Sequence, residues 1–422
     1  MCRKGSNRGG TRAGQHRDPC GNEMKRVAFY CQHVLGVGHL VRSTEIIRAL
    51  CPHSSVLLIS GGEPVDGFRF PSEVAVVNLP AVQTDADFAE LQVCSGSKSI
   101  EEIQDTRKTM LLSVLDEFVP DAFVIELFPF GRKRFAFELI PALEHIHQQP
   151  NRAKVVCSLR DILVQKRDQN KHEERVCSIV NRYFDLILVH GDPHFQKLDE
   201  TFSRVGDLNC PIRYTGYVAQ CSPETQAANL EIALPVEPFI LVTIGSGRYR
   251  NGQKLLRSTI ETAPLLRQKL PHQFVIFAGP FIPQEEFLKL RELAAQQPNV
   301  TLARYTPDLL PYMRRADLSI SMGGYNTIMN ILSTRARAIV FPYTANDDQE
   351  QYIRAAKLCQ LGVIAVIHPD ALEPPKLAAV IRAALCKAQA HFECDLRGAE
   401  ESARLLQELL HPAERVQEVS SV

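Results

Sequence analysis

The chain has 422 residues, of which 45% are hydrophobic and 23% are charged, and its formal net charge is zero. A chain of this length usually folds as two domains, and this composition is ordinary for a globular protein. The neutral charge balance gives no support for a nucleic-acid partner, because domains that bind nucleic acid are typically basic. No apolar run reaches the ~18 residues that indicate a membrane-spanning helix.

Twelve cysteines are scattered singly along the chain, and none forms a C-x-x-C pair. Several lie inside apolar segments, as Cys31, Cys157 and Cys177 do. This pattern is typical of reduced, buried thiols in a cytoplasmic protein and argues against disulfides or a zinc site. Residues 1–23 are rich in Gly, Arg and Ser without an apolar stretch, so we expect a disordered basic tail there.

The first structured unit joins a buried strand, a glycine turn and a helix. Residues 27–31 form the predicted strand, and apolar residues recur at helical spacing over residues 40–50. Gly36 and Gly38 lie in the turn, but the third glycine of a dinucleotide fingerprint is absent, so this half βαβ unit is a weak signal by itself. His39 has two interpretations: a residue hydrogen-bonded at the helix start, or a general base at the mouth of a pocket.

A carboxylate follows a later strand of the first half. Residues 122–125 form a predicted strand that ends at Glu126. The carboxyl end of a parallel strand faces the ligand crevice, so we expect Glu126 to orient His39. The alternative is a salt bridge between Glu126 and Arg132 or Arg134.

A second charged pair follows the strand predicted at residues 155–159, which ends in Arg160 and Asp161. Asp161 is a second candidate to hold the imidazole of His39. Arg160 is a candidate to meet a diphosphate or an anionic acceptor, and its alternative is a surface ion pair.

Two polar regions complete the first half. Residues 81–98 are predicted as a loop, and its triplet Asp85-Ala86-Asp87 is interpreted as solvated rather than as a metal site. Residues 219–238 are polar, with three prolines and no strong periodicity, so we expect a linker there. The first domain is then predicted over residues 24–218.

The second half repeats the pattern. Residues 239–244 form a continuous apolar strand, typical of a parallel sheet that is buried on both faces. The glycine loop Gly245-Ser246-Gly247 follows this strand and is a candidate phosphate contact, with Arg248 beside it. We expect a second domain over residues 239–412 and a tail over residues 413–422.

The most specific stretch runs from a strand through a glycine pair into a helix. The strand is predicted at residues 316–320, and Gly323 and Gly324 precede a helix that begins at Tyr325 or Asn326. Glycines let a backbone approach a ligand closely. The start of the helix offers unpaired N–H groups and the positive end of its dipole, which together suit a phosphate.

Glu350 and Gln351 follow the next predicted strand, at residues 338–342, and therefore lie at the same sheet edge as the glycine pair. The alternation of strands and helices, with glycine turns in both halves, predicts an α/β fold of two Rossmann-like domains facing across a cleft. Polar loops at that edge favour a nucleotide-sugar pocket over a packing feature.

These motifs resemble those of GT-B glycosyltransferases, and among them the bacterial N-acetylglucosaminyltransferases that complete lipid II, whose C-terminal domain is of the family 28 type. Gly36-x-Gly38-His39 resembles the N-terminal glycine loop of that family, and Gly245-Ser246-Gly247 resembles its second. Residues 321–332 resemble the segment whose helix N-terminus meets the donor diphosphate. Glu350-Gln351-Tyr352 resembles a segment that contacts donor sugar hydroxyls. The resemblance covers residues 24–412.

The resemblance implies an inverting sugar transfer from a nucleotide-sugar donor, expected to be a UDP-sugar, to an acceptor hydroxyl, without bound metal or cofactor. It implies that His39 is the base, that Glu126 or Asp161 orients it, and that Gly36 and Gly38 form an acceptor-side loop. The implied donor-binding residues are Gly245, Ser246, Gly247, Arg248, Ser321, Gly323, Gly324, Tyr325, Asn326, Thr327, Asn330, Glu350 and Gln351.

One departure from that family stands at Asn330, where the family has a Glu that takes both ribose hydroxyls. An amide can donate and accept, but it lacks the charge-assisted bond of a carboxylate. The substitution therefore puts affinity for a uridine diphosphate donor in question.

Two other function classes stay open. A sugar-nucleotide epimerase of the same fold would hydrolyse a nucleotide sugar without an acceptor, and a non-catalytic nucleotide- or glycan-binding protein is favoured slightly by Asn330. A Rossmann dehydrogenase is disfavoured by the incomplete glycine fingerprint. The acceptor stays open among a glycan, a lipid-linked molecule and a small molecule, and the apolar residues 127–130 leave open a peripheral membrane contact.

Overall fold

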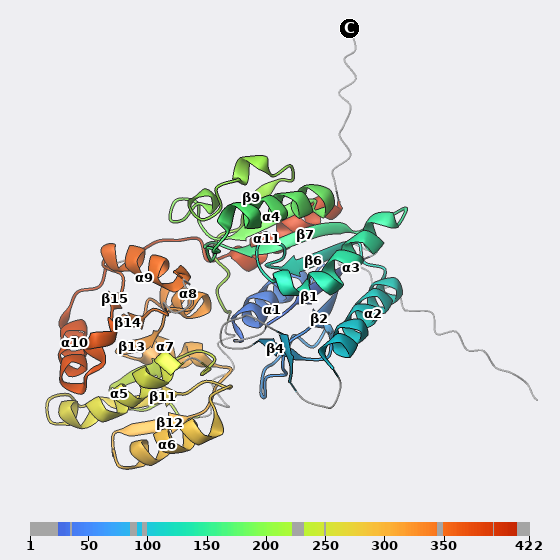
Figure 1. Ribbon diagram of the computed structural model, residues 1–422. Coiled ribbons are helices and arrows are strands. Elements are labelled where there is room, and N and C mark those ends of the chain that lie inside the picture. The colour runs from blue at the N-terminus through green and yellow to red at the C-terminus, as the bar shows by residue number, and fades with distance from the viewer. Residues whose placement is uncertain are drawn as a thin grey trace, which may run out of the picture.

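The structure is a computed structural model that describes residues 24–33, 36–84, 91–94, 99–221, 232–248, 250–343, 349–390 and 392–411. Two α/β domains lie beside each other, the first coloured blue to green and the second yellow to orange (Figure 1). The predicted fold class, two Rossmann-like domains facing across a cleft, is confirmed. The predicted tails and residues 222–231, half of the predicted linker, lie outside the described residues.

The first domain is built on a seven-stranded sheet in which all neighbouring strands are parallel. Its strands, in spatial order, are β3 (Ala75–Asn78), β2 (Ser54–Ser60), β1 (Lys25–Cys31), β6 (Ala122–Glu126), β7 (Lys154–Arg160), β8 (Leu186–His190) and β9 (Ile212–Tyr214). The chain order reverses between β1 and β6, so the loops that follow these two strands open side by side into the crevice where such folds bind ligands.

Helices cover both faces of this sheet because its central strands are apolar on both sides. Val27 and Phe29 of β1 face one hydrophobic cluster, whereas Ala28 and Tyr30 face another. The helices are α1 (Gly38–Leu50), α2 (Ile100–Phe118), α3 (Ala136–Gln148) and α4 (Gln169–Tyr183), with short 3-10 turns at Lys133–Phe135, Leu198–Glu200 and Val205–Asp207.

The region predicted as a loop over residues 81–98 contains an antiparallel pair, β4 (Val82–Thr84) with β5 (Leu91–Val93). The loop prediction is therefore wrong at these positions. Val82 is 1% exposed and packs into the core of the domain. This tertiary contact favours a strand, and the polar composition of the local sequence does not indicate it. The Asp85-Ala86-Asp87 triplet lies outside the described residues.

The second domain repeats the plan with a six-stranded parallel sheet. Its strands, in spatial order, are β12 (Val300–Ala303), β11 (Gln273–Phe277), β10 (Phe239–Thr243), β13 (Leu318–Met322), β14 (Ala338–Phe341) and β15 (Ala365–Val366). Its helices are α5 (Arg250–Arg267), α6 (Gln284–Ala295), α7 (Leu309–Arg315), α8 (Tyr325–Thr334), α9 (Glu350–Gln360) and α10 (Pro374–Cys386), with a 3-10 turn at Pro369–Leu372.

The chain returns to the first domain at its end. Helix α11 (Gly398–Leu410) packs against α1 and places Ala399, Ala403 and Leu406 in the hydrophobic cluster of the first sheet (Figure 1). The segment predicted as one domain over residues 239–412 therefore carries a helix that packs with the other domain. Its apolar stripe is equally suited to either core, so its sequence did not reveal which one it covers.

Candidate functional site

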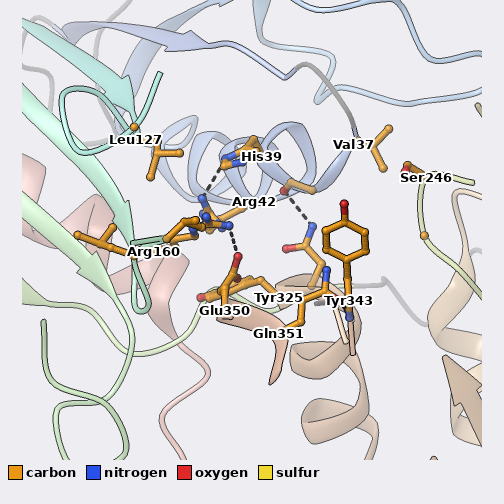
Figure 2. Close-up of a pocket in the computed structure, with 18 of the residues that line it drawn as sticks. Val37, His39, Arg42, Leu127, Arg160, Ser246, Tyr325, Tyr343, Glu350 and Gln351 are labelled. Carbon is orange, nitrogen blue, oxygen red and sulfur yellow. Dashed lines mark hydrogen bonds and ion pairs between the residues drawn. The ribbon is translucent and has the colours of Figure 1, made fainter. Parts of the chain in front are cut away.

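A cleft of about 2080 Å³ lies between the domains and is lined by residues of both. Figure 2 shows part of this lining. The predicted site residues that line it are Gly36, Gly38, His39, Gly245, Ser246, Gly324, Tyr325, Asn326, Thr327, Asn330, Glu350 and Gln351. Six other predicted residues do not line it: Glu126, Asp161, Gly247, Arg248, Ser321 and Gly323. The two glycine loops approach each other closely, since a Cβ on Gly36 would lie 3.3 Å from Cβ of Ser246.

His39 and Glu126 meet at the reversal point of the first sheet. Because β1 pairs with β6, the turn that starts α1 lies over the end of β6. The Nδ1 atom of His39 lies 2.9 Å from Oε1 of Glu126, and Arg42 also donates to that oxygen. Arg42 was missed by the sequence interpretation, although it stands three residues after His39 on the same helix face. The alternative partners proposed for Glu126, Arg132 and Arg134, form no described salt bridge with it.

The charge states of this group follow from its partners. Burial opposes ionisation of Glu126, but the guanidinium of Arg42 and the hydrogen bond from His39 hold the pKa of that carboxyl well below its usual range. Burial and the positive charge of Arg132 lower the pKa of His39 to about 3. An ionised carboxylate only accepts, so the neutral imidazole carries its proton on Nδ1 and keeps a lone pair on Nε2.

A buried chain of hydrogen bonds extends behind Glu126. The hydroxyl of Ser158 donates to Oε2 of Glu126 at 2.6 Å and lies 2.9 Å from Nε2 of His190. The Nδ1 atom of His190 lies 3.0 Å from Oγ1 of Thr215. Burial and the positive charge of Arg42 lower the pKa of His190 to about 3. Because Ser158 has only one proton to give, the neutral His190 carries its own proton on Nε2.

Asp161 does not hold His39 in the structure. Its carboxylate is fully buried and accepts from Nη2 of Arg354 at 2.6 Å, so the proposal that it orients the imidazole is corrected. The same guanidinium donates to Oε1 of Glu350 at 3.0 Å, and Arg160 bonds the other oxygen of Glu350 (Figure 2). Asp161 pairs with Arg354 because a buried charge without a partner of opposite charge is costly.

This ion cluster joins the two domains. Arg160 is the last residue of β7 in the first domain and Asp161 follows it, whereas Glu350 and Arg354 lie on α9 of the second domain. Burial opposes ionisation of Glu350, but Arg160 and Arg354 lower its pKa, so the carboxylate is charged. Both carboxylate oxygens of Glu350 are therefore engaged by arginines.

The helix α8 begins where the sequence predicts. Gly324 precedes it in an extended conformation and gives no side-chain cap, so the first N–H groups of the helix are uncapped where residues 324–327 line the cleft. Ser321 and Gly323 lie buried beneath this turn, and a Cβ on Gly323 would approach Cγ1 of Val340 at 3.1 Å. They support the turn rather than face the cleft.

Several side chains of α8 are bonded to the first domain. The amide of Asn326 donates to the carbonyl of Gly38 at 2.9 Å, and the hydroxyl of Tyr325 donates to the carbonyl of His190 at 3.1 Å. Asn330 donates to Oε1 of Gln220 at 2.7 Å. The buried Oδ1 of Asn330 has no hydrogen-bond partner among the described residues, so it can accept a hydrogen bond from a hydroxyl group of a ligand.

The second glycine loop is shaped by two residues with positive φ, Gly245 at 68° and Gly247 at 83°. Ser246 lies between them and lines the cleft, and its buried hydroxyl has no partner among the described residues. Arg248, the predicted phosphate contact beside this loop, instead forms an ion pair with Glu63 and lies over the ring of Phe281.

Gln351 faces the cleft with an oriented amide (Figure 2). Its Oε1 accepts the backbone N–H of Tyr343 at 3.0 Å, which turns its NH₂ group away from that contact. Within the described ranges, no three His, Cys, Asp or Glu side chains cluster as metal ligands. Likewise, no described helix combines the length and apolarity needed to cross a bilayer.

Comparisons with known proteins agree with this architecture. Residues 239–410 match the family model of the glycosyltransferase family 28 C-terminal domain. An uncharacterized glycosyltransferase of Methanopyrus kandleri is 23% identical over 214 residues, 49% of this chain and 57% of the relative. The UDP-N-acetylglucosamine–N-acetylmuramyl-(pentapeptide) pyrophosphoryl-undecaprenol N-acetylglucosamine transferase of Prochlorococcus marinus is 26% identical over 82 residues, 19% of this chain and 23% of that relative. The chain thus spans about half the length of the first relative and about a quarter of the second.

Two solved structures show the same fold. The UDP-GlcNAc 2-epimerase from Methanocaldococcus jannaschii has a TM-score of 0.58 at 11% identity and covers 92% of this chain and 99% of its own. MurG of Acinetobacter baumannii has a TM-score of 0.52 at 12% identity and covers 92% of this chain and 100% of its own. The chain as a whole therefore has the GT-B fold, and its residues 239–410 are similar to the glycosyltransferase family 28 C-terminal domain.

Proposed function

We propose that the protein transfers a sugar from a nucleoside-diphosphate sugar to an acceptor hydroxyl, with inversion at the anomeric carbon. The observation that carries this proposal is the neutral His39, whose Nδ1 proton is held by ionised Glu126, on the cleft wall opposite the uncapped start of α8. A base on one side and anion-binding N–H groups on the other are the two parts that this transfer requires.

In the proposed step, the acceptor oxygen attacks the anomeric carbon while its proton passes to Nε2 of His39. The bond between that carbon and the diphosphate oxygen breaks, and the nucleoside diphosphate leaves with the bonding electrons. The new negative charge on the diphosphate is stabilised by the first N–H groups of α8 and by the glycine loop at Gly245. Attack from the face opposite the leaving group gives inversion.

The donor is proposed to be a UDP-sugar, and an N-acetylhexosamine is the leading sugar. UDP-N-acetylglucosamine is named for the Prochlorococcus relative, and UDP-GlcNAc for the epimerase of the same fold. We expect two groups to contact the donor: Oδ1 of Asn330, which has no hydrogen-bond partner among the described residues, and the amide of Gln351.

A second candidate function is epimerisation of a nucleotide sugar. It is favoured by the likeness to the UDP-GlcNAc 2-epimerase over 92% of this chain. The two functions differ in their products, because an epimerase changes or hydrolyses the donor alone, whereas a transferase consumes it only with an acceptor. Chromatography of the products with and without acceptor sugars separates them.

The test begins with a thermal-shift panel of nucleoside diphosphates and their sugars, since a ligand that binds the folded state raises Tm. His39→Gln is then expected to bind the selected nucleotide as the wild type does but to lower kcat by roughly 10²–10⁴, the usual contribution of a general base. His194→Gln, at a 95% exposed side chain, is the matched control and should leave both nucleotide binding and kcat unchanged. Unchanged turnover in His39→Gln would contradict the proposed base, and a panel without any stabilising nucleotide would contradict donor binding.

A further inference from the structure

Positive charge gathers on one wall of the cleft although the chain as a whole is neutral. The part of the lining contributed by residues 127–178 has eight lysine or arginine side chains, against the two carboxylates Asp168 and Glu174. From residues 243–351, the described lining contributes one charged side chain, Glu350. The excess therefore belongs to the first domain, on the side from which an acceptor reaches His39.

Two half-buried arginines of this wall, Arg132 and Arg175, have no salt bridge to a carboxylate among the described residues. Arg132 follows the loop after β6, lines the cleft, and has a buried Nε atom without a hydrogen-bond partner in that set. Arg175, on α4, donates to the backbone carbonyl of Pro129 at 3.2 Å and to no other group among the described residues. By contrast, Arg42 and Arg160 in the same cleft are each paired with a carboxylate.

The two unpaired arginines belong to one surface. Arg175 bonds the loop that leads to Arg132, so α4 holds that loop in place. Their charges act on neighbouring groups: Arg132 helps to lower the pKa of His39, and burial together with Arg175 lowers the pKa of His172 to about 4. Burial also lowers the pKa of Arg175 itself, with no acid to offset it.

We propose that Arg132 and Arg175 form a subsite for an anionic group of the acceptor, a phosphate or a carboxylate, which this wall holds while the acceptor hydroxyl reaches His39. The inference rests on the proposed transferase function and names its acceptor class. Guanidinium groups suit such ligands because their planar fork matches the paired oxygens of phosphate and carboxylate. Cations left without a partner in a half-buried cleft are costly, and an anionic ligand offsets that cost.

The donor diphosphate is a weaker explanation for these two arginines. The donor elements, α8 and the glycine loop at Gly245, belong to the second domain, whereas Arg132 and Arg175 stand on the first. The donor and the anionic subsite should therefore be occupied together, and their binding can be measured separately.

The experiment titrates inorganic pyrophosphate calorimetrically into full-length protein that is already saturated with the nucleoside diphosphate from the thermal-shift panel. Arg132→Met and Arg175→Met are expected to weaken pyrophosphate binding by roughly tenfold to a hundredfold each, the usual effect of losing a charge-assisted hydrogen bond. Arg291→Met, at an exposed position on α6, is the matched control and should bind as the wild type. Nucleotide affinity should be unchanged in all three variants.

The outcomes separate this inference from the proposed function. If pyrophosphate does not bind beside the nucleotide, or binds equally to wild type and to both arginine variants, the anionic subsite is overturned while donor binding stands. Co-sedimentation with phosphatidylglycerol vesicles, compared with phosphatidylcholine vesicles, then identifies the source of the anion. Arginine-dependent binding to the anionic vesicles indicates a lipid headgroup, and pyrophosphate binding without vesicle binding indicates a phosphorylated acceptor in solution.

Discussion

At the scale of single residues, the ionisation of Glu126 decides which ring nitrogen of His39 carries the proton. Three donors converge on this carboxylate, from Arg42, His39 and Ser158. They keep it charged despite complete burial, and the charged carboxylate in turn holds the imidazole in the tautomer that leaves Nε2 ready to accept. Ser158 and His190 act through Glu126, so they are positioning residues.

The low pKa of His190 predicts a loss of stability in mild acid. The folded-state pKa of about 3 lies below the ordinary value of 6.5. Between these values the unfolded chain binds a proton that the folded chain does not, so the stabilisation is complete above pH 6.5 and declines as the pH falls toward 3. Each such histidine contributes a slope of about 1.4 kcal/mol per pH unit.

Urea unfolding of the wild type and of His190→Gln between pH 5 and pH 6.5 tests this expectation. The variant should be less stable at pH 7 because it interrupts the hydrogen bonds of Ser158 and Thr215. Its stability should nevertheless depend less steeply on pH, by about 1.4 kcal/mol per unit. Equal slopes in the two proteins would show that His190 is not the group responsible.

At the scale of elements, two glycine turns shape the donor side of the cleft in different ways. In the turn before α8, Gly324 has ordinary φ and ψ and open space around it, so its backbone does not require a glycine. The glycine there serves only to leave the backbone accessible to a ligand. The loop at residues 245–247 instead packs on Gly279, whose φ of 92° is unusual for any other residue. A Cβ there would lie 2.5 Å from the backbone nitrogen of Gly247.

Gly279→Ala is therefore expected to destabilise the protein by roughly 1–3 kcal/mol and to weaken nucleotide binding, because the loop must shift. Gly324→Ala is the matched comparison, and its stability should stay within about 0.5 kcal/mol of the wild type. Chemical denaturation gives the first quantity and calorimetry with the selected nucleotide gives the second. A Gly279→Ala protein as stable as Gly324→Ala would remove the structural role assigned to this glycine.

At the scale of the whole molecule, buried ion pairs connect the two domains across the cleft. Arg354 and Asp161 are both fully buried, and Arg354 also pairs with Glu350, which in turn pairs with Arg160. The chain also crosses back from the second domain, and its last helix, α11, packs into the core of the first domain (Figure 1). The domains are therefore joined by buried polar contacts as well as by the chain.

Asp161→Asn removes one charge of the buried pair and should cost about 3–5 kcal/mol, because Arg354 is left partly uncompensated. We expect a lower Tm and a larger radius of gyration in solution scattering, as the cleft opens. Asp317→Asn, in a partly exposed pair with His272, is the control and should cost under ~1 kcal/mol. A compact Asp161→Asn protein with the wild-type Tm would mean that the pair does not hold the domains together.

Much of this protein follows from local sequence. The apolar strands, the glycine turns and the helix that begins at Tyr325 were predicted because periodicity and backbone freedom act over a few residues. The pairing of His39 with Glu126 also followed, since both stand at the carboxyl ends of parallel strands.

Tertiary structure alone decided which charges meet. The sequence predicted that Asp161 could orient His39. In the structure Asp161 instead accepts a hydrogen bond from the guanidinium of Arg354, which is 193 residues away in the chain. Nothing local distinguishes an arginine that pairs from one that stays free, because the choice depends on which strands and helices become neighbours. For the same reason the domain that α11 covers, the relay through Ser158 and His190, and the unpaired Arg132 and Arg175 emerged only from the folded molecule.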